Sequence, residues 1–304
     1  MPWNGASRGI LLTLVPGLVL AGCTTAPAPA PAPVAAAPAA VTAEPRVPPG
    51  MQWLYGSGEA AATSLQAYDA FRDHVLAAAR ARPAQSVVLD TGSTLDSPRF
   101  VPCGDKPLAV VLDVDETAIQ NLGYEYDEAV RGRAYDQQIW NRWEQTGANA
   151  VAPIPGAVPA LRAIRDAGVA VIFNSNRLAA NAAQSEAALN GAGLGPARHG
   201  DTLFLQGDVA AGSGKDPRRA AVAQRYCVIA MAGDQLGDFS DLFNARTLAI
   251  PDRRRAAATA PFASLWGNGW FMLSNPVYGP GLRGNFDEVF PADKRWSDPA
   301  GGSE

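Results

Sequence analysis

The stretch from Leu108 to Thr117 constrains the fold more than any other part of the sequence. A short apolar run, 108–112, leads directly into Asp113 and Asp115. A run of this length that is apolar at every position is typical of a strand buried on both faces of a parallel sheet, and such sheets bind ligands at the carboxyl ends of their strands. Two crowded carboxylates need a cation or the counter-ion of an anionic substrate. The stretch therefore predicts a catalytic nucleophile, although a helix cap made by Asp115 or Thr117 explains the same residues.

Strand-like and helix-like patterns alternate from Met51 onward. Strands are expected, besides 108–112, at 86–89, 169–173, 202–205, 228–232 and 246–250, and helices at 59–82, 157–167, 178–189 and 217–224. An irregular, aromatic-rich stretch at about 121–155 interrupts the series. Alternation of this kind predicts an α/β fold with a doubly wound, mostly parallel sheet that carries helices on both faces. We expect the interrupting stretch to form a small helical cap insert.

The first residues have the pattern of an export signal. Arg8 precedes an apolar segment, 10–20, that is too short to span a membrane and fits the hydrophobic part of a signal peptide. The following Leu20-Ala-Gly-Cys23 resembles the lipobox of bacterial lipoproteins, in which the cysteine is lipidated and becomes the mature N-terminus. We therefore expect a signal peptide at 1–22 and lipidation of Cys23. An ordinary signal peptide with an incidental cysteine is the alternative.

The residues after Cys23 support a membrane anchor. Residues 23–50 are a tether rich in Ala and Pro, without apolar periodicity, and prolines favour an extended, semi-rigid chain. Thr24 is not the aspartate that retains lipoproteins in the inner membrane, so the resemblance implies a lipid-anchored protein of the bacterial outer membrane, facing the periplasm or the exterior. The remaining residues, 51–304, form the expected catalytic domain.

Composition excludes several classes of function. Lys plus Arg number 25 against 29 Asp plus Glu, so no broad basic surface is available for a nucleic-acid polymer. The only histidines are His74 and His199, and neither lies in a motif for a phosphohistidine or a triad base. Histidine-dependent phosphatases and serine hydrolases are therefore poor fits. A local site must bind any anionic ligand.

Polar residues collect at the ends of three expected strands. Asp113 follows the first, Asn174 to Arg177 follow the second, Gly233 to Asp238 follow the later one, and Lys215 precedes a helix. A hydroxyl, an ammonium group and several carboxylates are the groups that phosphoryl transfer onto a protein carboxylate requires. The oxygen donors suit Mg²⁺. In this order, the ensemble resembles the phosphatases of the haloacid dehalogenase superfamily, which implies their Rossmann-like core.

A narrower resemblance is to the class C acid phosphatases, the outer-membrane lipoprotein phosphatases with four motif aspartates. It covers nearly all of residues 50–292. The strings that carry it are Asp113-Val-Asp-Glu-Thr117 with Asn121, Trp140-Asn-Arg-Trp143, Pro155-Gly-Ala157, Ser175-Asn-Arg177, Gly233-Asp-Gln-Leu-Gly-Asp-Phe239 and Met272-Leu-Ser-Asn-Pro-Val-Tyr-Gly279. Three features depart from the family pattern: Gln235 replaces a usual asparagine, Gly237 is smaller than the common polar residue, and the spacing around Lys215 is irregular.

The resemblance implies a role for each motif aspartate. Asp113 would attack phosphorus and form an aspartyl-phosphate, and Asp115 would protonate the leaving oxygen and later deprotonate the attacking water. Mg²⁺ would be held by Asp113, Asp234 and the backbone carbonyl of Asp115, with Asp238 as a ligand or as a partner of a ligand. The resemblance thus implies a Mg²⁺-dependent phosphomonoesterase.

Further residues would bind the substrate. Ser175, Asn176 and Lys215 would hold the phosphoryl oxygens, although a solvated lysine in a surface loop is an alternative reading of Lys215. Arg177 would add a contact to the substrate, unless it forms a structural ion pair. Tyr278, with an aromatic residue of the insert, would clamp the base of a nucleoside monophosphate.

Several questions stay open at this stage. Trp140 and Trp143 either contribute to the clamp or pack into the core. A carbon–halogen hydrolase would use an Asp113-like nucleophile but would not need Asp115, and a binding or surface lipoprotein could retain the same fold without catalysis. The sequence is compatible with a homo-oligomer.

The sequence contains two cysteines besides Cys23. Cys103 and Cys227 form an even pair in a chain with an export signal, which is compatible with a disulfide. In the resembled fold each cysteine lies upstream of its aspartate, near the amino-terminal edge of neighbouring strands. A buried free thiol at Cys227 is the alternative.

Overall fold

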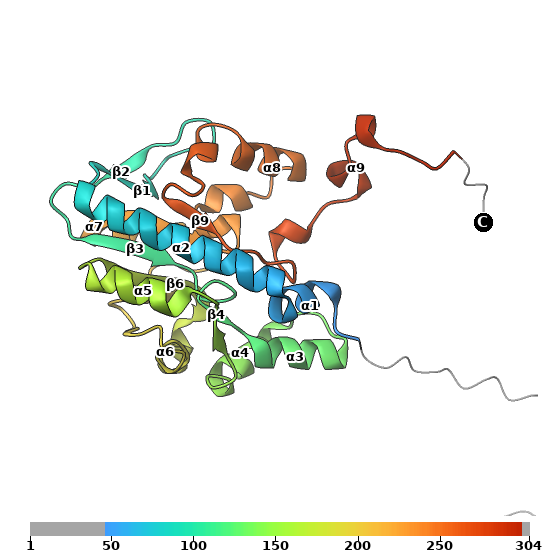
Figure 1. Cartoon of the computed structure of the whole chain (residues 1–304), viewed down its shortest axis with the longest axis horizontal. Coiled ribbons are helices and arrows are strands. Elements are labelled where there is room, and N and C mark those ends of the chain that lie inside the picture. Colours follow the sequence, from blue (N-terminus) through green and yellow to red (C-terminus); the bar gives the residue numbers. More distant parts are fainter. Residues whose placement is uncertain (1–45, 300–304) are drawn as a thin grey trace, which may run out of the picture. The chain divides into compact units, whose positions relative to one another are not determined.

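One five-stranded sheet organises the chain. The computed structural model describes residues 46–299 (Figure 1). All neighbouring strands of the sheet are parallel, in the spatial order β7 (Leu203–Gln206), β6 (Ala170–Leu178), β3 (Leu108–Leu112), β8 (Cys227–Gly233) and β9 (Trp270–Met272). The predicted α/β fold with a helix-covered parallel sheet is thereby confirmed.

The side chains of β3 show why this strand lies at the centre. Leu108, Val110 and Leu112 enter one apolar cluster, while Ala109 and Val111 enter the cluster on the opposite face. All five are buried, and full burial of a large apolar side chain contributes about 1.5 to 3 kcal/mol. A strand that is buried on both faces has no polar positions, which explains the uninterrupted apolar run.

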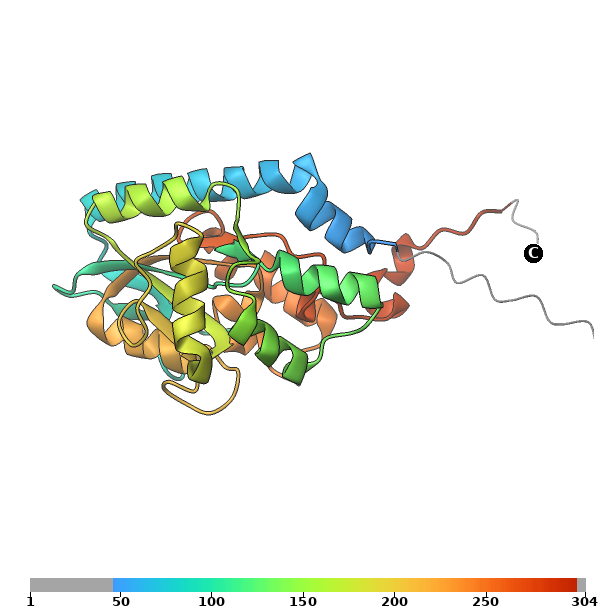
Figure 2. The ribbon, with the colours of Figure 1, turned by 90° about the horizontal axis from the view of Figure 1, so that it is seen from below.

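Helices cover both faces of the sheet. The first cluster contains side chains of α2 (Gly58–Ala81), α5 (Ala157–Asp166) and α6 (Ala182–Gly191). In Figure 2, α2 and α5 lie side by side on this face. The second cluster contains side chains of α7 (Asp216–Arg225) and of the 3-10 turns Asp241–Asn244 and Phe262–Leu265.

Two helices begin the described chain. Helix α1 (Pro49–Gly56) was not expected from the sequence and starts just before the predicted domain boundary. The Ser57 side chain accepts a hydrogen bond from the Ala60 amide at 3.0 Å, which caps α2. Helix α2 buries Tyr68, Phe71 and Val75, whose helical spacing places them on one face.

One strand prediction is confirmed outside the main sheet, and another is wrong. The residues predicted at 86–89 lie in β1 (Gln85–Leu89), which pairs antiparallel with β2 (Phe100–Pro102) outside the main sheet. The strand predicted at 246–250 is wrong, because this segment is a turn that leads into α8 (Ile250–Ala258). Proline in the first turn favours a helix start, and Pro251 supplies it. The fifth strand is β9 instead.

The aromatic-rich stretch forms a helical insert. Helices α3 (Leu122–Arg131) and α4 (Gln137–Thr146) lie between β4 (Ile119–Gln120) and β5 (Ala152–Pro153), which pair antiparallel at the base of the insert. The Asp136 side chain accepts hydrogen bonds from the backbone amides of Gln138 and Ile139 and so caps α4. The remaining short elements are η1 (Ala179–Asn181), η2 (Leu236–Asp238), η5 (Pro280–Leu282), α9 (Phe286–Val289) and η6 (Ala292–Lys294).

A disulfide joins Cys103 to Cys227, with a Cα–Cα distance of 4.6 Å. The pairing considered from the sequence is therefore present, at the end of the sheet opposite the motif aspartates. The expected signal peptide at 1–22, Cys23 and nearly all of the tether lie outside the described residues. Within 46–299, no helix combines the length and the hydrophobicity that a membrane span needs.

Candidate active site

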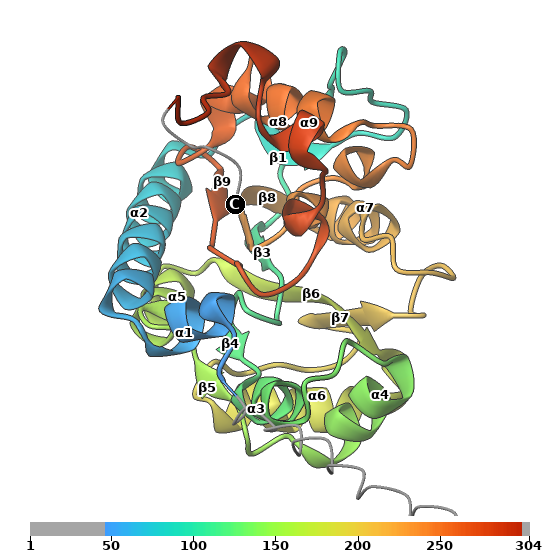
Figure 3. The same ribbon diagram turned by 90° about the vertical axis from the view of Figure 1, so that its right-hand side faces the viewer.

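The carboxyl ends of neighbouring strands bring the motif residues together. Asp113 follows β3, Ser175 lies in the last part of β6, and Asp234 follows β8. Because β3 pairs with both β6 and β8, these residues emerge at one edge of the sheet. Figure 3 shows this edge, with the insert helices α3 and α4 on one side of it and the segment after β9 on the other. The predicted convergence of three strand exits is found in the structure.

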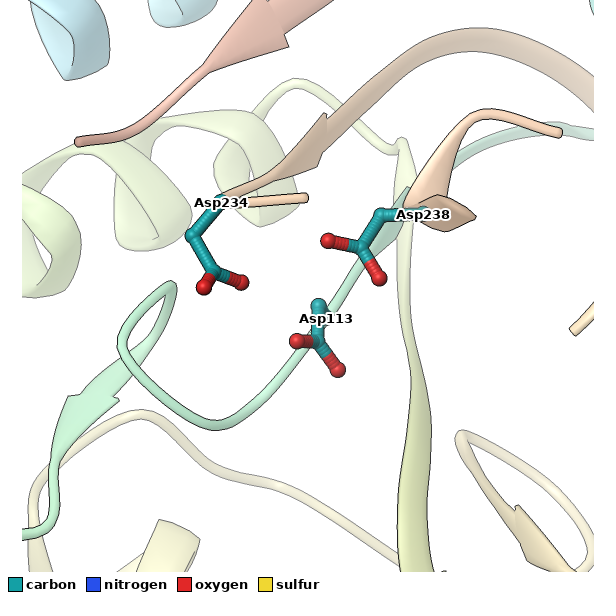
Figure 4. Close-up of side chains that lie close together, drawn as sticks. All are labelled: Asp113, Asp234 and Asp238. Carbon is teal, nitrogen blue, oxygen red and sulfur yellow. The ribbon is translucent and has the colours of Figure 1, made fainter. Parts of the chain in front are cut away.

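Three buried carboxylates form the centre of the site. One carboxylate oxygen each of Asp113, Asp234 and Asp238 lies within 4.8 Å of the others (Figure 4). The three residues are 9%, 7% and 7% exposed, so water solvates them little. Burial raises the pKa of Asp113 well above its usual range, and the neighbouring carboxylates add to the rise. Burial, and next the charge of Asp238, raises the pKa of Asp234 to about 7. The cluster therefore needs positive charge.

Lys215 supplies part of that charge. It precedes α7 and is 6% exposed, so the alternative of a solvated surface lysine is wrong. Its Nζ donates to Oδ1 of Asp113 and, at 2.6 Å, to Oδ1 of Asp238. Burial alone would lower the pKa of Lys215, but the two carboxylates outweigh it and raise the pKa above its ordinary value. The irregular spacing of the sequence around Lys215 did not prevent it from reaching the site.

The Asp115 side chain has hydrogen-bond partners outside this cluster. Its Oδ1 accepts hydrogen bonds from Asn121 Nδ2 at 3.0 Å and from Arg177 Nε at 2.9 Å. Its Oδ2 accepts a longer bond from Ser175 Oγ at 3.3 Å. The carboxylate of Asp115 is therefore held by residues other than the three clustered aspartates and Lys215.

Arg177 is an ion-pair partner in this structure rather than an open substrate contact. It is 2% exposed, and NH2 donates to Asn121 Oδ1 at 2.8 Å, in addition to the bond that Nε makes to Asp115. Its guanidinium lies over the ring of Trp140, 5.8 Å from the centroid. Arg177 thus forms, with Asp115, the structural ion pair that the sequence left open as the alternative to a substrate contact.

The other predicted phosphate-binding residues differ in exposure. Ser175 is buried, and its Oγ accepts the Arg177 amide at 3.0 Å. Asn176 is exposed, and its Oδ1 accepts a bond from Arg218 at 2.6 Å. Ser175 therefore lies inside the site next to Asp115, whereas Asn176 lies at its rim.

Some residues that hold Asp234 were not assigned a role from the sequence. Thr117 Oγ1 donates to Oδ1 of Asp234 at 3.1 Å, and Asn275 Nδ2 donates to Oδ2 at 2.7 Å. Gln235, one of the departures from the family pattern, donates to Oδ2 at 3.1 Å. Thr117 and Asn275 both lie in strings that carried the resemblance, but a string does not reveal which carboxylate a side chain will orient.

The second departure, Gly237, has a steric explanation. A Cβ at this position would lie 2.1 Å from Nδ2 of Asn244, so a side chain does not fit unless Asn244 moves. Gly237 belongs to the short turn η2, which carries Asp238. The glycine therefore allows the turn to pack closely and to place Asp238 beside Lys215.

The aromatic residues divide into two groups. Trp140 and Trp143 are half-buried and pack on Tyr124, with ring centroids 4.8 and 6.3 Å from it, so both contribute to the packing of the insert. Tyr278 lies after β9 and is half-buried, and its hydroxyl donates to Oε2 of Glu116. Glu116 is a buried residue of the site that sequence reasoning missed, although the string Asp113-Val-Asp-Glu-Thr117 contains it.

Comparisons with known proteins agree with this arrangement. Residues 56–281 match the family model described as HAD (haloacid dehalogenase) superfamily, subfamily IIIB (Acid phosphatase). Two solved structures of the class C acid phosphatase from Bacillus anthracis, one of them with tungstate bound, share the fold at TM-scores of 0.61 and 0.60. Each is 24% identical in sequence to this chain, and the matched region covers 76% of this chain and 84% of the solved chain. No match was found among curated proteins.

Proposed function

Because the chain belongs to the acid phosphatase family of haloacid dehalogenase subfamily IIIB and is thus a phosphomonoesterase, we propose that it works through an aspartyl-phosphate on Asp113 and depends on Mg²⁺. The observation that carries this proposal is the buried group of Asp113, Asp234 and Asp238 with Lys215 between two of its members. A nucleophile, acidic oxygen donors and a cation for phosphoryl oxygens lie together there.

The first half-reaction transfers the phosphoryl group. An Asp113 carboxylate oxygen attacks phosphorus, the bond from phosphorus to the leaving oxygen breaks, and Asp115 gives that oxygen a proton. Lys215 and the Ser175 hydroxyl stabilise the charge on the phosphoryl oxygens. In the second half-reaction Asp115 takes a proton from water, the water oxygen attacks phosphorus, and the bond between phosphorus and the Asp113 oxygen breaks, which yields inorganic phosphate and free Asp113.

The donor set fits Mg²⁺. All three clustered side chains offer carboxylate oxygens, the donors that hard cations prefer, and the raised pKa values of Asp113 and Asp234 express the unfavourable negative charge that a cation would relieve. Asp113, Asp234 and the backbone carbonyl of Asp115 would hold the ion, with Asp238 in or next to the ligand set. The ion would neutralise charge on the phosphoryl oxygens.

We further propose nucleoside monophosphates as the preferred esters. Tyr278 follows β9 close to the carboxylates, since Asn275, three residues earlier, holds Asp234. A half-buried ring at the edge of a phosphate site offers a stacking surface, and stacking tolerates many bases.

The proposed location is the outer membrane, through lipidation of Cys23. The lipobox-like string and the Ala/Pro tether support it. Growth of producing cells with a labelled fatty acid tests the anchor: label should appear in the protein and disappear in the Cys23→Ala variant. Label retained by that variant would contradict lipidation at Cys23.

A substrate panel tests the activity. The protein, freed of metal by a chelator and then supplied with Mg²⁺, should release phosphate from nucleoside monophosphates faster than from small alkyl phosphates. Tungstate, an oxyanion that the similar solved structure binds, should inhibit competitively. Absence of Mg²⁺-dependent phosphate release from every ester would contradict the proposal and favour a binding lipoprotein. Halide release from a haloalkanoate would favour a carbon–halogen hydrolase.

A further inference from the structure

Glu116 is a buried charged residue that the proposed reaction does not use. It lies between Asp115 and Thr117, is 1% exposed, and has a φ of +53°. Residues other than glycine rarely adopt this left-handed backbone conformation. A residue that keeps a buried carboxylate in an unfavourable backbone conformation is a candidate for a specific role.

Four hydrogen-bond donors converge on its carboxylate. Oε1 accepts from the Asn121 amide at 2.8 Å and from the Tyr55 hydroxyl at 3.2 Å. Oε2 accepts from Asn121 Nδ2 at 2.9 Å and from the Tyr278 hydroxyl. An ionised carboxylate is the side-chain group that only accepts hydrogen bonds, so it alone satisfies all four donors.

The two tyrosines come from distant parts of the chain. Tyr55 lies in the last turn of α1, 61 residues before Glu116, and Tyr278 lies 162 residues after it. Their segments also touch directly, because a Cβ at Gly50 of α1 would lie 2.2 Å from the carbonyl oxygen of Pro276. Figure 1 shows α1 next to the segment that follows β9. One carboxylate therefore fastens two segments together beside the phosphate site.

A second contact fixes the other side of the Tyr278 segment. Gln235 Nε2 donates to the Tyr278 carbonyl at 3.2 Å, and the Gln235 side chain lies against Gly279, where a Cβ would come within 2.6 Å. Gln235 also donates to Asp234. Contacts to Glu116 at the hydroxyl and to Gln235 at the backbone thus set the position of the Tyr278 ring.

We propose that Glu116 is a positioning residue for substrate specificity: by holding the Tyr55 and Tyr278 hydroxyls it fixes the ring of Tyr278 as a wall for the part of the substrate beyond the phosphate. This inference rests on the proposed preference for nucleoside monophosphates. In this role Glu116 would contact neither the phosphate nor the leaving oxygen, because four protein donors already occupy its carboxylate. Its removal should therefore change how well a nucleoside with its aromatic base is bound, and not the rate of phosphoryl transfer.

The variant Glu116→Gln tests the role of the carboxylate. The amide has the same shape but must place an NH₂ group against donors, so at least one tyrosine hydroxyl loses its acceptor. Tyr278→Phe is the complementary variant, because it keeps the ring and removes only the hydroxyl. Glu59→Gln, at an exposed position in the first turn of α2, is the matched control.

The kinetic result expected is a split between KM and kcat. Loss of one hydrogen bond to a charged group should raise KM for nucleoside monophosphates about tenfold in Glu116→Gln, with kcat changed by less than about threefold. KM for a small alkyl phosphate should stay within about twofold, since it does not reach the ring. Tyr278→Phe should also raise KM for nucleoside monophosphates. The double variant should raise this KM little more than either single variant does. An equal fall of kcat on both esters would overturn the proposal, since it would place Glu116 in the chemistry of Asp115.

Amide hydrogen exchange supplies a readout that does not depend on the substrate. In Glu116→Gln, residues 275–280 and 49–56 should exchange faster than in wild type, while the central strand 108–112 should not change. If wild type shows no preference for nucleoside monophosphates, the proposed substrate is wrong and exchange alone decides the positioning role. Unchanged exchange in both segments would overturn it. Should Glu116→Gln fail to fold, Tyr278→Phe and Tyr55→Phe provide the same comparison.

Discussion

Arg177 Nε donates to Oδ1 of Asp115 at 2.9 Å, and Asn121 donates to the same oxygen at 3.0 Å. The other oxygen, Oδ2, has a single longer contact, to Ser175 Oγ at 3.3 Å. The two oxygens of this carboxylate are therefore not equivalent: Oδ1 is held in place and Oδ2 is available. A proton exchanged with a leaving group or with water is expected to move through Oδ2.

Arg177→Gln should impair the turnover of poor leaving groups selectively. Without the guanidinium Asp115 loses its orientation, and a poor leaving oxygen depends most on a well-placed proton donor. We expect kcat for an alkyl phosphate to fall roughly 10² to 10⁴-fold, with a much smaller fall for a nitrophenyl phosphate. Steady-state kinetics on both esters measure this. Arg162→Gln, at an exposed position of α5, serves as the control. Equal losses on both esters would contradict the assigned role of Arg177.

Asp113→Asn should abolish turnover without unfolding the protein. The amide cannot attack phosphorus, whereas it removes a charge that burial disfavours. Phosphate release should fall below detection while the thermal midpoint stays within a few degrees of wild type. A covalent phosphoryl group trapped by acid quench should be present in wild type and missing in the variant. Wild-type turnover in Asp113→Asn would rule out the mechanism.

The sequence predicted the centre of the site because its residues follow buried strands. Asp113 and Asp234 lie directly after β3 and β8, and the carboxyl ends of parallel strands share one edge. Lys215 was harder to place, since it precedes a helix and its surroundings depart from the family spacing. Its burial depends on Asp113 and Asp238, which are distant in sequence.

Local patterns also could not separate certain roles and elements. Arg177 follows Ser175 as a substrate-binding residue would, and only the fold places its guanidinium on Asp115. The segment 246–250 has the composition of a strand, but tertiary contacts and Pro251 favour a turn and a helix. Strand β9 is three residues long, too short to show a period.

The metal-free protein should lose stability as the pH rises. Burial, and next Asp238, raises the folded pKa of Asp234 to about 7, and burial, and next Asp115, raises that of Glu116 to about 7 as well. A raised carboxyl pKa contributes stability that is full below the unfolded value near 4 and is lost as the pH rises toward 7. Each group contributes a slope of at most about 1.4 kcal/mol per pH unit. Thermal unfolding between pH 4.5 and 8, with chelator, measures it.

Asp234→Asn should make that pH dependence shallower, since one of the contributing carboxyls is removed. Asp105→Asn, at an exposed position, should leave it unchanged. A wild-type stability that rises between pH 5 and 7 in the absence of metal would show that the carboxylates are not destabilised by their burial.

Mg²⁺ should stabilise the wild-type protein and leave Asp234→Asn almost unaffected. A ligand that binds only the folded state stabilises by RT ln(1 + [L]/Kd), which is about 2.7 kcal/mol at a hundredfold excess over Kd. The thermal midpoint should therefore rise on titration with Mg²⁺ and return when a chelator is added. The same rise in Asp234→Asn would place the ion elsewhere.

Loss of the Cys103–Cys227 disulfide should destabilise the domain strongly. The bridge closes a loop with a sequence separation of 124. Chain-entropy models give about 4 to 5 kcal/mol for a loop of this size, or roughly 10 to 15 °C in the thermal midpoint of a domain of this length. Cys103→Ser with Cys227→Ala, compared with wild type with and without reductant, measures the effect. Identical midpoints in all three samples would show that the bridge does not contribute.

The same bridge determines what a protease can do to the molecule. Arg131, the last residue of α3, is exposed and precedes the segment that leads to α4, so it offers a cleavage point inside the covalent ring. A cut there separates Asp113 from Asp234 along the backbone, yet the two polypeptides stay linked through Cys103 and Cys227. On a non-reducing gel the nicked species should migrate as one molecule of undiminished mass. A cut in the insert therefore leaves the nucleophile Asp113 and the carboxylate Asp234 on two polypeptides that remain covalently joined by the disulfide.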